Sequence, residues 1–97
     1  MGKNADEAAE LLALLANKNR LAIIEQLVDK EMSVGAIAKK LSLSQSALSQ
    51  HLARLRRDGL VGTRRQAQTI FYSLNDKATE AILRCLYDIY SPAKNKN

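Results

Sequence analysis

The segment from Leu41 to Val61, LSLSQSALSQHLARLRRDGLV, constrains the fold more than any other part of the chain. Within it, Leu48, Leu52 and Leu55 recur at spacings of four and then three, so they share one face of a helix. A polar tight turn precedes this helix, and a shorter helix pattern precedes the turn. Two short helices joined in this way predict a helix-turn-helix over about residues 33–58.

Local signals mark both ends of the second helix and the segment that follows it. Ser44 can cap its first turn, because a serine hydroxyl accepts a free backbone N–H there. Gly59 predicts its end, since glycine readily adopts the left-handed conformation that closes a helix. Two strands are predicted next, Val61–Arg65 and Thr69–Leu74, with a connecting loop longer than two residues because the linker holds no Asn-Gly pair. This hairpin, at about residues 60–74, is the predicted wing.

Three further helices complete the predicted fold. The expected helices cover about residues 5–16, 18–30 and 76–91. Asn4 and Glu7 resemble a capping box at the start of the first, Asn17 can cap the second, and Pro92 ends the last before a polar tail. Residues 1–97 are thus predicted to form a single domain that is mainly α with a small β-hairpin. Its order, α-α-α-α-β-β-α, is that of a winged helix-turn-helix.

Charge is distributed unevenly along the 97 residues, whose net charge is +5. Residues 33–75 hold seven arginines and lysines against one aspartate, whereas acidic side chains predominate in residues 1–32. Charge alone would favour a solvated basic face, but its coincidence with the helix pair predicts attraction to DNA, a polyanion. The chain has one cysteine, no signal sequence and no apolar run of about 18 residues, so we expect a cytoplasmic protein without membrane contact.

The polar face of the second helix predicts contact with DNA bases. Gln45, Ser46, Ser49 and Gln50 lie near its N-terminal half, the end that enters the major groove in helix-turn-helix proteins. Glutamine can bond adenine through two hydrogen bonds, and serine can pair with either base or with phosphate. An ordinary polar helix face is the alternative, but serines weaken a helix interior unless a ligand needs them.

A second set of side chains is expected to contact the DNA backbone. The arginines of the second helix lie farther along it, where they suit phosphates, and those of the wing can contact phosphates or a narrow minor groove. The predicted backbone contacts are Ser44, Arg54, Arg56, Arg57, Arg64, Arg65, Gln66 and Gln68.

The first and last helices carry apolar stripes wider than one small core needs, which predicts a homodimer. The expected interface residues are Leu11, Leu12, Leu15, Ile82, Cys85, Leu86, Ile89 and Tyr90. Alternatively, these helices simply close the monomer. A twofold pair would place two recognition helices about 34 Å apart, one turn of DNA, and would require an inverted-repeat operator.

Other chemistry finds little support in the sequence. Neither the one histidine, His51, nor the one cysteine, Cys85, has the partners of a catalytic pair, so we expect no enzyme. Cys85 is interpreted as a buried small hydrophobe, because a redox switch would need a second thiol from a partner. A redox- or ligand-responsive switch through Cys85 and a protein-interaction module that uses the terminal helices are alternative functions.

Three strings resemble the ArsR/SmtB family of bacterial winged helix-turn-helix repressors. They are Ser44–Leu52, Leu55–Val61 and Ala67–Tyr72, and Asn17–Leu21 resembles the start of that family's second helix. The resemblance covers roughly residues 8–90 and is greatest to the NolR/HlyU-like branch, through the string SQSALSQHL. It implies a homodimer joined by the first and last helices that binds a palindromic operator through the fourth helix and the wing.

The resemblance also bears on cofactors. Relatives that sense metals use a Cys-x-Cys in the third helix, where Ser33 and Gly35 stand here, or Asp and His pairs in the last helix. That helix has Asp76, Glu80 and Asp88 but no histidine, so neither metal site is expected. We therefore predict a sequence-specific regulator of transcription that binds double-stranded DNA as a homodimer, without metal or other cofactor, and acts as a repressor.

Overall fold

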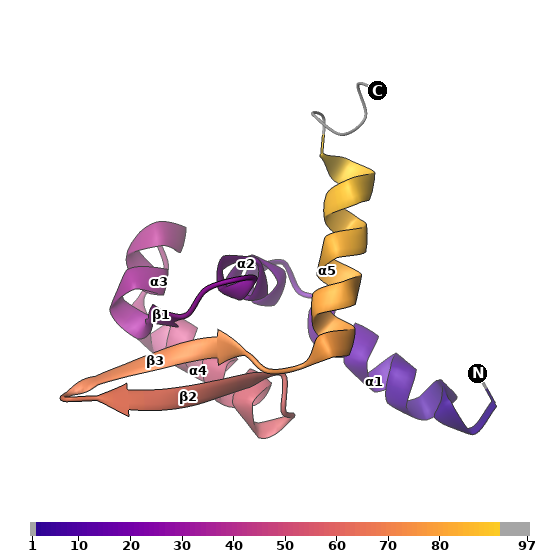
Figure 1. Cartoon of the computed structure of the whole chain (residues 1–97), viewed down its shortest axis with the longest axis horizontal. Coiled ribbons are helices and arrows are strands. Elements are labelled where there is room, and N and C mark those ends of the chain that lie inside the picture. Colours follow the sequence, from indigo (N-terminus) through magenta and orange to yellow (C-terminus); the bar gives the residue numbers. More distant parts are fainter. Residues whose placement is uncertain (1, 92–97) are drawn as a thin grey trace.

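The computed structural model describes residues 2–91, apart from the side chain of Lys3 (Figure 1). It confirms the mainly helical winged helix-turn-helix, with one strand that the sequence did not predict. The elements are η1 (Gly2–Asn4), α1 (Ala5–Leu15), α2 (Lys18–Leu27), β1 (Met32–Ser33), α3 (Val34–Leu41), α4 (Gln45–Arg57), β2 (Val61–Gln66), β3 (Thr69–Leu74) and α5 (Lys77–Tyr90). The predicted polar tail after Pro92 lies outside the described residues.

Most helices begin at a side chain that caps the first turn. The capping oxygens accept backbone N–H bonds of 2.9–3.2 Å at Asn17, Ser33, Ser44 and Asp76. The predicted capping box at Asn4 is wrong, because its side chain makes no capping bond. Asn4 ends the 3₁₀ turn η1 with φ −90° and ψ 1°, whereas an N-cap residue normally has an extended backbone.

The sheet has three antiparallel strands in the order β1-β3-β2. The strand that the sequence did not predict, β1, pairs Met32 with Tyr72 and Ser33 with Phe71. Two residues are too short to show an alternating pattern, so only the partner strand reveals β1. It ties the segment before α3 to the base of the hairpin.

The hairpin loop corrects a second prediction. Gln66 pairs with Thr69, so only Ala67 and Gln68 connect the strands, instead of the longer loop expected without Asn-Gly. Ala67 has φ +56°, a left-handed conformation that costs a residue with a Cβ about 1–2 kcal/mol. Pairing along the full length of β2 and β3 offsets this local cost. The preference for Asn-Gly in two-residue turns does not take this pairing into account.

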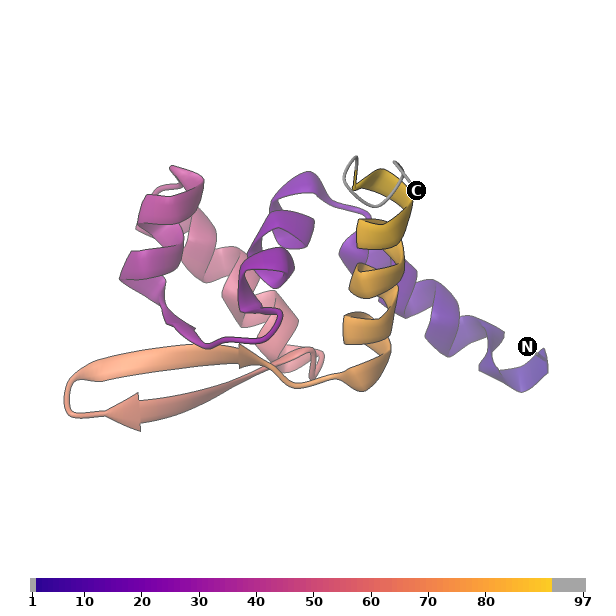
Figure 2. The same ribbon diagram turned by 45° about the horizontal axis from the view of Figure 1, so that its top comes forward.

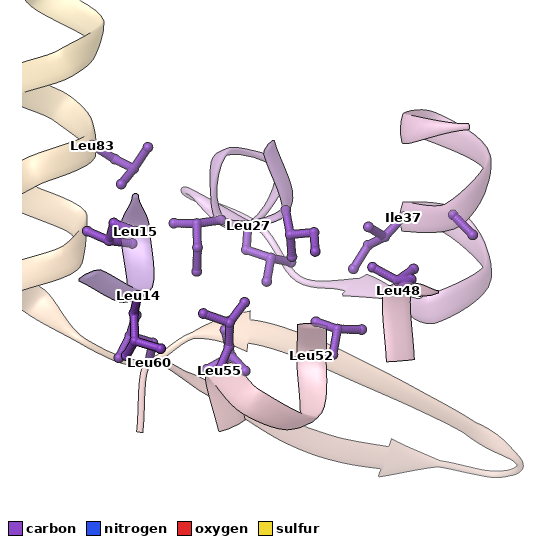
Figure 3. Close-up of a cluster of buried hydrophobic side chains, with 13 residues drawn as sticks. Leu14, Leu15, Leu27, Ile37, Leu48, Leu52, Leu55, Leu60 and Leu83 are labelled. Carbon is purple, nitrogen blue, oxygen red and sulfur yellow. The ribbon is translucent and has the colours of Figure 1, made fainter. Parts of the chain in front are cut away.

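One hydrophobic core joins the helices to the base of the sheet, as the buried side chains in Figure 3 show. The predicted leucine face of α4 is confirmed, because Leu48, Leu52 and Leu55 are all fully buried. The buried apolar residues are Leu14, Leu15, Ile23, Ile24, Leu27, Ile37, Ala38, Leu48, Leu52, Leu55, Leu60, Val61 and Leu83.

The terminal helices lie at the end of the molecule opposite the tip of the β2–β3 hairpin (Figures 1 and 2). In α5 the buried residues are Thr79 and Leu83, whereas Ile82 and Leu86 are half-buried and Ile89 is exposed. In α1, Leu15 is only 4% exposed and belongs to the core of the single chain. None of the helices in residues 2–91 is long and apolar enough to span a membrane.

The C-terminus of α4 is closed by backbone bonds that only a left-handed residue allows. Gly59 has φ +84°; its N–H bonds the Arg56 carbonyl at 3.0 Å, and the N–H of Leu60 bonds the Leu55 carbonyl at 2.9 Å. A Cβ at Gly59 would meet no atom within 4 Å, so the backbone angle alone requires glycine.

This arrangement predicts opposite effects for the same substitution at two glycines. Gly59→Ala should lower the free energy of unfolding by about 1 kcal/mol, because alanine resists a positive φ. Gly35→Ala, in the first turn of α3 where a Cβ also meets nothing, should raise it by about 0.5 kcal/mol. Urea denaturation followed by circular dichroism measures both, and effects of the same sign would contradict this account.

Candidate nucleic-acid interface

Four side chains predicted to read bases stand on the exposed side of α4. Gln45, Ser46, Ser49 and Gln50 are all exposed, and the buried leucines occupy the other side. Within residues 2–91 these four side chains make no hydrogen bond to the protein. Their amides and hydroxyls therefore remain available to a ligand, and they span the first half of the helix.

Ser44 has a structural role at the start of this face. Its hydroxyl oxygen accepts the backbone N–H of Ala47 at 3.1 Å, which satisfies a free donor of the first turn. The side chain is exposed, so its O–H can still donate to a phosphate.

The arginines of α4 continue the exposed side toward its C-terminus. Arg54 pairs with Asp58 at 3.4 Å, and both side chains are largely exposed, so this pair holds Arg54 weakly. Arg56 and Arg57 are exposed and have no ion-pair partner in the described part of the chain. All three cations are therefore accessible to a ligand, and their contact with phosphates stays a prediction.

The two arginines of the wing, Arg64 and Arg65, were given the same predicted role, but their surroundings in the structure differ. The guanidinium of Arg64 donates to both carboxylate oxygens of Glu31, with Nε contacts of 2.9 and 3.0 Å and a further bond from Nη2. Nη1 donates to Gln66 at 2.9 Å, and Cζ lies 4.8 Å from the centroid of the Phe71 ring. The guanidinium N–H groups of Arg64, which were predicted to bond a phosphate, are thus bonded to Glu31 and Gln66.

The ion pair stabilises both charges. Hydrogen bonding from Arg64 holds the pKa of the Glu31 carboxyl below its usual value, and the same contact raises the pKa of Arg64. A carboxyl with a depressed pKa loses its contribution only as pH falls through that lowered value. The contact therefore persists throughout the neutral and mildly acidic range.

Arg65 lies on the other face of the hairpin. Successive residues of a strand point to opposite faces, so Arg65 shares a face with Val61 and with its cross-strand partner Ile70. It is exposed and makes no ion pair within the described residues. Gln68 is exposed in the hairpin loop, whereas Gln66 is engaged with Arg64.

The predicted interface residues of α1 and α5 differ in how far they are exposed in the single chain. Leu12, Ile89 and Tyr90 are 55%, 54% and 75% exposed, which is unusual for large apolar side chains on a small domain. Leu11, Ile82 and Leu86 are half-buried, and Leu15 offers a partner almost no surface. Cys85 is also exposed, so its interpretation as a buried hydrophobe is wrong for the single chain.

A groove between α2 and α5 continues this surface. It has a volume of about 570 Å³ and is lined by Leu21, Glu25, Leu83, Leu86, Tyr87, Tyr90 and Ser91. A side-chain hydrogen bond with Glu25 raises the pKa of the Tyr87 hydroxyl.

The carboxylates considered as metal ligands have other partners. Asp76 accepts bonds from the backbone N–H and hydroxyl of Thr79, and Glu80 accepts a bond from Arg84. Ser33 caps α3. No group of three His, Cys, Asp or Glu side chains that could hold a metal ion occurs among the residues that the structure describes.

Sequence reasoning missed Glu31 and Phe71. Thirty-three positions separate Glu31 from Arg64, and no local sequence pattern indicates that Glu31 contacts the wing. The only available signal was an acidic residue next to a segment otherwise rich in positive charge.

Comparisons with known proteins agree with this geometry. A profile described as "Bacterial regulatory protein, arsR family" matches residues 17–63. "Transcriptional activator HlyU" of Vibrio cholerae is 52% identical over 93 residues, which are 96% of this chain and 86% of that protein. "Nodulation protein NolR" of Rhizobium meliloti is 54% identical over 88 residues, 91% of this chain and 72% of that protein.

A more distant relative and a solved structure extend the similarity. "Biofilm growth-associated repressor" of Xylella fastidiosa is 39% identical over 90 residues, 93% of this chain and 79% of that protein. The structure of HlyU from Vibrio cholerae superposes with a TM-score of 0.88 at 52% identity, covering 93% of this chain and 98% of that one.

The cap at Ser44 allows a stability prediction. Ser44→Ala should lower the free energy of unfolding by about 1 kcal/mol, because the N–H of Ala47 loses its acceptor. Ser46→Ala, two residues on and without a capping bond, should change it by less than about 0.5 kcal/mol. Chemical denaturation measures both variants, and equal losses would remove the distinction between cap and exposed serine.

Proposed function

Because the chain belongs to the ArsR family of bacterial transcriptional regulators, which bind DNA, we propose that it represses transcription by binding an inverted-repeat operator as a homodimer, without a bound metal ion. The observation that carries the proposal is the exposed side of α4. The polar groups of its first half have no partner in the described residues, while the leucines on its other side fix its orientation.

We assign base recognition to the first half of α4. Gln45 and Gln50 can each form two hydrogen bonds with an adenine edge, and Ser46 and Ser49 can pair with bases or phosphates. Arg54, Arg56 and Arg57 follow them toward the helix C-terminus, where we assign them to phosphates together with Ser44. Because Arg64 is already paired with Glu31, we assign the phosphate contact of the wing to Arg65.

The exposed apolar residues of α1 and α5 support a homodimer. Burying Leu12, Ile89 and Tyr90 against a second copy removes apolar surface that one chain leaves in water. Both helices lie away from the tip of the hairpin, so a partner bound there leaves the wings unobstructed (Figure 2). A twofold dimer presents two copies of α4, which favours an operator with half-sites about 34 Å apart.

Repression is the simplest outcome of such binding. A dimer that occupies a promoter excludes polymerase without any further contact, and the Xylella fastidiosa relative bears the name of a repressor. The Vibrio cholerae relative is named an activator, so the position of the operator relative to the promoter decides the outcome. Ser33 and Gly35 supply no thiolate, and α5 has no histidine and only one thiol, Cys85, which supports binding without metal.

Base recognition and phosphate contact predict different losses. Gln45→Ala should weaken operator binding by about 1–3 kcal/mol and leave binding to random DNA nearly unchanged, since only base contacts discriminate sequences. Arg65→Ala should weaken both alike and lower the slope of log K against log salt by about one unit. Fluorescence anisotropy titrations at several salt concentrations, with an operator selected from random duplexes, measure these quantities. Equal losses of Gln45→Ala on both DNAs would refute its role.

Dimerisation predicts the effect of a charge on the exposed side of α1. Leu12→Glu should yield a folded monomer, because this side chain is 55% exposed in the single chain and the core does not need it. Its affinity for an inverted repeat should fall roughly 100-fold or more, since each half-site is then bound independently. Sedimentation equilibrium and circular dichroism measure assembly and folding. Ala13→Glu, on another side of α1, is the control, and a dimeric Leu12→Glu variant would exclude this interface.

A further inference from the structure

The contact between Arg64 and Glu31 joins the two outer strands of the sheet. Arg64 lies on β2, Glu31 immediately precedes β1, and β3 lies between these strands. The guanidinium of Arg64 therefore lies over the Phe71 ring of β3, with Cζ 4.8 Å from the ring centroid, while Nε and Nη2 bond the carboxylate. Two Nε contacts of 2.9 and 3.0 Å and a bond from Nη2 complete the bridge.

This bridge is placed where the wing leaves the body of the protein. Pairing between β1 and β3 stops at Ser33 and Phe71, opposite Arg64 in β2. From Arg64 to Ile70 every residue is exposed, so the tip of the hairpin projects beyond the core (Figure 1). Among the described residues, no side-chain hydrogen bond or ion pair joins the wing to another element farther toward its tip than the bridge to Glu31.

The bridge also makes the two arginines of the wing unequal, because only Arg64 has an ion-pair partner in the part of the chain that the structure describes. Arg64 and Arg65 point to opposite faces because they are consecutive in a strand. Glu31 neutralises the charge on one face, and the cation on the other face keeps no partner within the described residues. The core fixes these directions, because Arg65 shares its face with the buried Val61, and the bridge holds Arg64 on the opposite face.

We propose that Glu31 is a positioning residue for DNA binding: its carboxylate holds Arg64 across β3, fixes the direction of the wing, and leaves Arg65 to meet the DNA backbone. The inference rests on the proposed function, in which the wing contacts phosphates through Arg65. Glu31 itself touches no DNA and acts only through Arg64.

Two physical effects predict opposite signs for the loss of this carboxylate. Removing a negative charge from a DNA-binding protein should tighten binding, because the field that attracts the polyanion becomes stronger. Loosening the wing should weaken binding, because ordering it on DNA then costs conformational entropy. The positioning role requires the second effect to exceed the first, so the direction of change decides between them.

The test compares matched removals of one carboxylate. Glu31→Gln should weaken operator binding about three- to ten-fold, the cost of ordering a side chain or two on binding. Glu10→Gln, an identical change at an exposed residue of α1, should leave binding unchanged or slightly tighter. Fluorescence anisotropy with the full chain measures both, and amide hydrogen exchange should become faster in residues 64–70 of the Glu31 variant only. Binding by Glu31→Gln as tight as that of the wild type, or tighter, overturns the proposal.

A charge swap separates positioning from direct contact. Arg64→Glu alone should bind DNA at least ten-fold more weakly than the wild type, since it repels both Glu31 and phosphate. Adding Glu31→Arg restores the ion pair with the partners exchanged and should recover most of that loss. Because Glu31→Arg also raises the net charge by two, Arg64→Glu combined with Glu10→Arg is the control that has the same net charge. If the swap recovered no more affinity than this control, Arg64 would not act through the ion pair, and the proposal would fail. This comparison also holds where Glu31→Gln lowers the melting temperature.

The Arg65→Ala titration distinguishes a failure of the proposed function from a failure of the positioning role of Glu31. An unchanged affinity and salt slope for that variant would remove the wing from the DNA contacts, so the proposed function would fail in that part. A normal Arg65 effect together with an unaffected Glu31→Gln variant would overturn only the positioning role.

Discussion

Burial of the leucine face of α4 is the constraint on which the rest of the molecule depends. Leu48, Leu52 and Leu55 have no exposed surface, and each contributes about 1.5–3 kcal/mol by leaving water. Rotating the helix by one residue, about 100°, would expose leucine and bury glutamine or serine without partners, which costs free energy twice. The core therefore sets the side that α4 shows to solvent. The first and last helices pack on the same core through Leu15 and Leu83, so the position of α4 relative to any partner surface is fixed by apolar contacts (Figure 3).

The turn between α2 and β1 carries two carboxylates that bond arginines of other elements. Asp29 has φ +72°, and its carboxylate accepts a bond of 2.6 Å from Arg84 of α5, which also bonds Glu80 at 2.9 Å. Two residues later, Glu31 bonds Arg64 of the wing. One short turn thus links α5 to the hairpin, although these elements share few other contacts. Such exposed ion pairs add little to global stability, so the role proposed for Glu31 is to position the wing and not to stabilise the fold.

Features encoded within a few residues were predictable from the sequence. The caps at Asn17 and Ser44, the glycine that ends α4 and the buried leucine spacing all follow from local chemistry. Features that depend on a distant partner were not. The strand β1 exists only because β3 lies beside it, and Glu31 acquires its role from a residue 33 positions away. The two-residue loop at Ala67 shows the same limit, since strand pairing overrode the local preference for glycine.

The terminal helices were the hardest case because they are apolar on more than one side. In α1 the sequence offered Leu11, Leu12, Leu14 and Leu15, and periodicity did not separate those that serve the core from those that face outward. The structure divides them: Leu14 and Leu15 are buried, whereas Leu12 is exposed. In α5, Thr79 and Leu83 lie in the core, whereas Ile89 and Tyr90 are exposed.

A helix that packs one side on its own core and leaves another apolar side in water is stable only if that second side is small or covered. Here Leu12, Ile89 and Tyr90 are all more than half exposed, and they lie on helices that pack on the same core as α4. In the proposed homodimer, a partner that covers them is held at a fixed position relative to α4, so the fold would set the spacing of the two copies of α4.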